Sequence, residues 1–141
     1  MIRKLFILFI IFLTLPLSVK PSTDEWKLYP SYKNATYCEI AKDKIYILAS
    51  GALYSYNIDD NEVRIYDKIN TLSDVDITHI AYSGLIDGLL VVYSNANIDI
   101  LYDDETIYNI SDFKNKSLPN KKINSVNIQN DKALISTEFG I

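Results

Sequence analysis

The chain has 141 residues, of which 48% are hydrophobic, and it carries 18 acidic against 14 basic residues. This length allows one ordinary domain with a buried core. The acidic excess argues against nucleic-acid binding, which depends on Lys and Arg side chains that neutralise phosphates. Because Cys38 is the only cysteine, stability has to come from a packed core and not from intramolecular disulfides.

The first 20 residues are predicted to be a signal peptide. Arg3 and Lys4 precede an almost unbroken apolar run over residues 5–17. That run is too short for a transmembrane helix, which needs about 20 residues, so export is favoured over an uncleaved membrane anchor. We expect cleavage between Ser18 and Thr23. Without residues 1–20 the chain keeps 11 basic and 18 acidic residues, a formal net charge of −7.

The rest of the chain has the pattern of antiparallel strands. Short runs rich in Ile, Val, Leu and Tyr are separated by Asp, Asn and Gly clusters at intervals of about 8–12 residues. On this pattern Cys38 is expected to be a small buried strand residue, with a reactive thiol or an intermolecular partner as the alternatives.

A repeat organises these strands. Asp43, Asp87 and Asp131 are spaced 44 residues apart, and each precedes a short apolar strand. A second anchor, Leu72 against Leu118, repeats after 46 residues. The two extra residues are expected in the loop 83–86, because a repeat protein accommodates insertions in its loops.

A period of 44–46 residues with four strands predicts a β-propeller blade. The expected fold class is therefore all-β: a partial β-propeller of about two and a half four-stranded antiparallel blades in the domain 21–141. A solenoid would use shorter units. The blades are expected at residues 28–71, 72–117 and, incompletely, 118–141. Their strands are expected at residues 37–41, 45–50, 53–58, 62–67, 77–82, 89–94, 98–102, 106–110, 123–128 and 133–137.

A propeller blade buries its faces only against neighbouring blades, and known propellers have about four to eight of them. We therefore expect this chain to be part of a longer protein whose remaining blades pack against it. Leu134, Ile135 and the outer faces of Val91 and Leu101 are expected to lack a neighbour. The piece alone is then predicted to aggregate instead of behaving as a well-folded monomer.

The polar motifs do not predict catalysis. The acidic turns 59–62 and 103–105 lack the glycine of a calcium loop and are interpreted as ordinary turns, and Asp74 and Asp76 are assigned to a blade connection. His79, the only histidine, is expected to be structural or solvent-facing. Nucleophile elbows, phosphate loops and Cys/His metal spacings are absent from the sequence. We therefore assign no catalytic, cofactor-binding or metal-binding residue, no cofactor and no enzymatic activity.

Several ordered motifs resemble the N-terminal propeller of the PorZ family, whose members are surface components of the type IX secretion system of Bacteroidetes. The resemblance covers about residues 25–141, although Ala52 and Ala96 stand where glycine is common. The motifs include Trp26-x-x-Tyr29-x-x-Tyr32, Leu53-Tyr54-Ser55-Tyr56-Asn57, Lys68-Ile69-Asn70-x-Leu72-Ser73-Asp74, Tyr93-x-Asn95-x-Asn97-Ile98-Asp99, Asn109-Ile110-x-Asp112 and Ala133-Leu134-Ile135-Ser136-Thr137-x-Phe139-Gly140-Ile141.

The resemblance implies a non-catalytic binding and scaffold propeller that acts in the surface attachment and maturation of secreted cargo. The implied partners are other secretion-system surface proteins, with lipopolysaccharide or glycan as further candidates. The implied location is the outer-membrane-associated cell surface or the periplasm. Two alternatives stay open: the periplasmic sensor propeller of a hybrid two-component system, whose blades the Leu72–Ile77 segment also resembles, and the N-terminal part of a propeller glycosidase or lyase.

Overall fold

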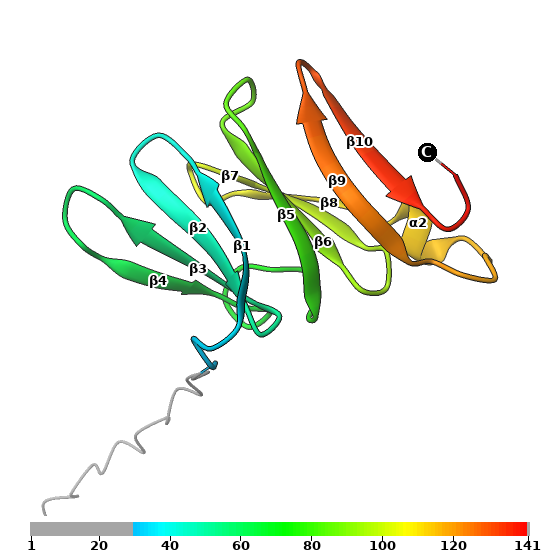
Figure 1. The fold of residues 1–141 in the computed structure, drawn as a ribbon, viewed down its shortest axis with the longest axis horizontal. Helices are drawn as coiled ribbons and strands as arrows, with labels where there is room; N and C mark the ends of the chain where they lie inside the picture. The colour runs from blue at the N-terminus through cyan, green and yellow to red at the C-terminus, as the bar shows by residue number, and fades with distance from the viewer. Residues whose placement is uncertain (1–29, 141) are drawn as a thin grey trace, which may run out of the picture.

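The computed structural model describes residues 30–140, so the predicted signal peptide lies outside the described part of the chain. The strands form three antiparallel sheets, two of four strands and one of two, and within each sheet neighbours in space are neighbours in sequence (Figure 1). One four-stranded sheet contains β1 (Ala35–Ile40), β2 (Lys44–Ala49), β3 (Ala52–Asn57) and β4 (Val63–Tyr66). The other contains β5 (Ile77–Ser83), β6 (Gly88–Tyr93), β7 (Ile98–Tyr102) and β8 (Ile107–Ile110). The two-stranded sheet contains β9 (Ile123–Gln129) and β10 (Lys132–Thr137).

This architecture confirms the predicted all-β partial propeller, and every predicted strand overlaps an observed one. We call β1–β4 the first blade, β5–β8 the second and β9–β10 the third. The one helix among residues 30–140 is the single turn α2 (Asp112–Asn115), and nothing in this range is long and apolar enough to be a membrane-spanning helix.

The meander order gives the blades two distinct ends. The turns β1–β2, β3–β4, β5–β6, β7–β8 and β9–β10 lie at one end, here called the hairpin end. The turns β2–β3 and β6–β7 and the segments between blades lie at the other, here called the connection end. Because antiparallel neighbours reverse direction at every turn, successive turns must alternate between the two ends.

The core lies between the blades. At the first junction, between the first and second blades, Tyr46, Leu48 and Leu53 pack against Leu89 and Leu101, and all five are at most 1% exposed. At the second junction, between the second and third blades, the buried residues belong to a separate cluster: Leu90, Val92, Ala96, Ile98 and Ile123. Each face of the second blade therefore serves a different junction.

Three expectations about burial are wrong. Ile135 does have a neighbour, because it packs against the buried residues of the second junction, whereas Leu134 is 42% exposed, as expected. Val91 and Leu101 are fully buried, because their side chains point toward the first blade and not toward the open side. Cys38 lies on β1 as predicted but is exposed. Its counterpart on β5, Ile80, is only 2% exposed because the first blade covers it. Among residues 30–140 the corresponding face of the first blade has no blade against it.

Candidate functional site

A polar network ties the connection between the first two blades to the second blade. Asp74, in this connection, is only 6% exposed. Its Oδ2 accepts hydrogen bonds from Asn95 Nδ2 at 2.7 Å and Asn97 Nδ2 at 3.4 Å, and lies 2.7 Å from Lys114 Nζ. Lys68 Nζ lies 3.5 Å from Oδ1. Side chains from the connection, the β6–β7 turn and α2 therefore meet on one carboxylate.

The charge of Asp74 is stabilised inside this network. The hydrogen bonds from Lys114 and Asn95 hold the pKa of Asp74 well below its usual range, outweighing the opposing effect of burial. The side chain is therefore ionised across the physiological pH range. Hydrogen bonds to an ionised acceptor are stronger than neutral ones, so they fix the connection against the second blade.

A second carboxylate, Asp99, extends the network into the blade. It is fully buried and accepts three hydrogen bonds: from Tyr93 Oη at 2.5 Å, Ser73 N at 2.8 Å and Asn109 Nδ2 at 2.8 Å. Burial, and then the hydrogen bond to Asp99, raises the pKa of Tyr93. Because a buried carboxylate is tolerated only when it is well partnered, these contacts give the Asn95-x-Asn97-Ile98-Asp99 motif a structural role.

At the hairpin end, Lys42 links the first two blades. Its Nζ lies 2.6 Å from Asp87 Oδ2 and 3.8 Å from Asp103 Oδ2. Tyr82 Oη donates a hydrogen bond to Asp103 Oδ2 at 3.3 Å, and burial, then the Asp103 charge, raises the pKa of Tyr82 to about 12. Lys42 is well exposed, so this ion pair orients the turns more than it stabilises the fold.

His79 contacts all three blades. It is 9% exposed, its Nδ1 lies 3.0 Å from Thr78 Oγ1, and its Nε2 donates to the backbone oxygen of Asn124 on β9 at 3.2 Å. Its ring centroid lies 5.4 Å from that of Tyr37 on β1. These contacts agree with the structural role expected for the only histidine.

The acidic turns are built by their own side chains. Asp60 Oδ1 accepts a hydrogen bond from Glu62 N at 2.9 Å, and Asp104 Oδ1 accepts one from Thr106 N at 3.1 Å. Both follow the turn interpretation, in which Asp bonds to backbone two residues ahead. Between residues 30 and 140, no three His, Cys, Asp or Glu side chains are grouped to hold a metal ion. That the protein binds no metal stays a prediction.

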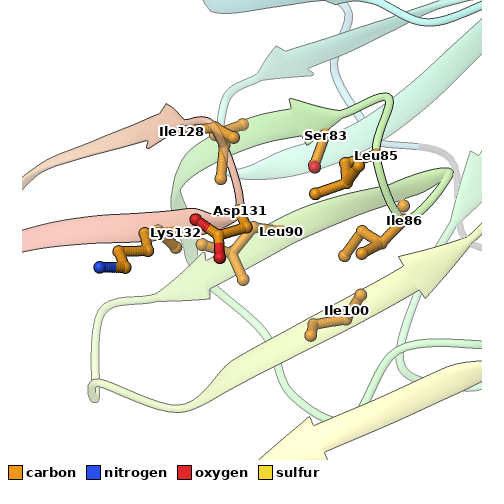
Figure 2. Close-up of a pocket in the computed structure, with 11 residues that line it drawn as sticks. Ser83, Leu85, Ile86, Leu90, Ile100, Ile128, Asp131 and Lys132 are labelled. Atoms are coloured by element: carbon orange, nitrogen blue, oxygen red, sulfur yellow. The ribbon is translucent and has the colours of Figure 1, made fainter.

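An apolar pocket of about 170 Å³ opens at the hairpin end of the second junction (Figure 2). Figure 2 shows apolar side chains from three places around it, whereas the ammonium group of Lys132 points away from Leu85 and Ile86. The apolar side chains are Leu85 and Ile86 from the β5–β6 turn, Leu90 and Ile100 from the second blade, and Ile128 from β9. Leu85 is 68% exposed and Ile86 47%, so the mouth of the pocket is itself apolar.

The repeat shows which positions border this space. Leu90 in the pocket corresponds to Tyr46 one period earlier, and Ala133 corresponds to Leu89. Tyr46 and Leu89 are fully buried at the first junction, where Tyr46 also stacks on Tyr82 with ring centroids 6.3 Å apart. The matching positions therefore hold smaller side chains at the second junction than at the first.

The lining of the pocket suits binding. Its polar residues are Ser83, Asp131 and Lys132, while the other lining residues are apolar or glycine. Ligand sites have this kind of lining but are usually larger, at about 300–1,000 Å³. Sequence reasoning assigned no site residue and missed this pocket. The signal available to it was the apolar pair Leu85 and Ile86 in a turn where polar residues are expected.

One family model covers most of the described residues. A family model for the N-terminal β-propeller domain of the type IX secretion protein PorZ matches residues 45–141. The chain belongs to the PorZ N-terminal β-propeller family. The match includes every residue of the Asp74 and Asp99 networks, and it confirms the resemblance inferred from the motifs.

A solved structure of PorZ from Porphyromonas gingivalis is also similar. The chain is 29% identical to it, with a TM-score of 0.74, and the similarity covers 78% of this chain and 15% of that chain. That PorZ is described as an essential bacterial surface component of the type IX secretion system of a human oral bacterium. A comparison with curated proteins gives no match.

Proposed function

We propose that the chain is part of a non-catalytic binding and scaffold propeller in a type IX secretion accessory protein. The observation that carries this proposal is membership in the PorZ N-terminal propeller family. In this proposal residues 1–20 direct export, and the mature propeller, from residue 21, acts at the outer-membrane-associated surface. Its partners are other surface proteins of the secretion system and the blades that complete the ring.

The chemistry of the described residues supports binding over catalysis. The two most buried networks use their carboxylates, Asp74 and Asp99, to hold the backbone and neighbouring side chains. The pocket at the second junction is lined mainly by apolar side chains. Rigid blades with an accessible apolar pocket fit a module that positions other molecules, in this case proteins that attach and mature secreted cargo.

Deleting the full gene tests the proposal. In the deletion strain we expect secreted cargo to accumulate with uncleaved sorting signals, while induction of carbohydrate-utilisation operons stays normal. A sensor propeller of a hybrid two-component system predicts the opposite pair of results. Immunoblots of cargo size and operon transcript levels, measured in the same strain, distinguish the two. Normal cargo maturation would end the proposal.

Complementation separates the role of the fold from that of the surface. Asp99→Leu removes the buried acceptor for three hydrogen bonds, so we expect this variant to fail to restore cargo maturation. Asp76→Asn changes an exposed carboxylate in the same blade connection and keeps a residue type that tolerates its positive φ of 58°. It should restore maturation fully. Full restoration by Asp99→Leu would show that the buried network is not needed for cargo maturation.

A further inference from the structure

We draw no further inference here: the strongest candidate, the acidic surface that the turns of the first two blades form at the hairpin end around Asp87 and Asp103, is a cluster of carboxylates with Lys42 beside it, and nothing in residues 30–140 of the structure shows which ligand would bind there.

Discussion

The first and second junctions are built from the same repeat but differ in how completely they are packed. The first junction buries Tyr46, Leu89 and Leu101 with no exposed surface. The second leaves the pocket of about 170 Å³ at the hairpin end and another of about 120 Å³ beside Phe113 and Phe139. The comparison shows that the backbone repeat sets where blades meet, and that matching positions hold different side chains: Tyr46 and Leu89 at the first junction, Leu90 and Ala133 at the second.

The connection between the first two blades is also bound more firmly than the connection between the second and third. Asp74 in the first connection corresponds, after 46 residues, to Asn120 in the second. Asp74 is buried in an ionic network, whereas Asn120 is exposed and accepts a hydrogen bond from Lys122 N at 3.0 Å. An aspartate gathers charged and amide donors from distant segments, but the neutral amide at Asn120 bonds only within its own turn. The first connection is therefore the more firmly held.

The largest expected difference between the junctions concerns their apolar residues. Tyr46→Ala should lower the free energy of unfolding by about 3–5 kcal/mol, because it opens a cavity in a junction that has no room to relax. Leu90→Ala, at the matching position of the second junction, should lower it by only about 2 kcal/mol, because its side chain already borders an open pocket. Urea denaturation measures both values, at protein concentrations below those at which the chain self-associates. Equal losses would contradict the difference in packing.

The two connections give the next largest difference. Asp74→Ala should lower the free energy of unfolding by about 2–3 kcal/mol, because Lys114 and Asn95 lose their buried partner. Asn120→Ala, its repeat counterpart, should change it by less than about 0.5 kcal/mol, as expected for an exposed residue. Urea denaturation again measures both values. If Asn120→Ala lowered the free energy of unfolding as much as Asp74→Ala, the two connections would be held equally firmly, against this account.

The contribution of the Asp74 carboxylate to stability should depend on pH. The pKa of Asp74 is lower in the folded protein than its ordinary value of 3.8, so its stabilising contribution is complete above that value. The contribution is lost as the pH falls further, through the folded-state pKa. Asp74→Asn should therefore show a shallower loss of stability below about pH 4 than the unmodified chain. Urea denaturation at several pH values measures this. If the free energy of unfolding fell equally steeply below about pH 4 in the variant and in the unmodified chain, the ionised Asp74 would not be stabilising the network.

A smaller effect of opposite sign is expected at the pocket. Ala133→Leu supplies the side chain that the repeat has at Leu89 and should raise the free energy of unfolding by about 0.5–1 kcal/mol. A thermal melt followed by circular dichroism gives the shift, and Ala133→Ser is the matched control that adds no apolar volume. A lower melting temperature for the Leu variant would mean that the pocket has less room than its lining indicates.

Much of the fold could be predicted because its signals are local. Period-2 runs of Ile, Val, Leu and Tyr mark the strands, Asp and Asn mark the turns, and the 44-residue spacing of Asp43, Asp87 and Asp131 identifies the blades. These signals need no knowledge of which blade lies beside which. The family match and the structure confirm the partial propeller on that basis.

What could not be predicted depends on neighbours distant in the sequence. Cys38 was expected to be buried, but whether a strand residue is covered depends on the presence of a blade on its side. The network around Asp99 was also missed. One local signal was available: Asp99 lies within a strand whose other residues are mostly apolar, and an acid in that position needs buried donors. Its donors Ser73 and Asn109 lie on other segments, so the sequence did not identify them.

Native-state hydrogen exchange tests the difference between the junctions most directly. Amides of β2, β3, β6 and β7, whose strands enclose or adjoin the closed first junction, should exchange only through global unfolding, with free energies equal to that from urea. Amides of β9 and β10 should exchange through a smaller opening, because the second junction can separate while the first stays packed. A lower exchange free energy for β9–β10 than for β6 supports the account. Equal values across all these strands would contradict it.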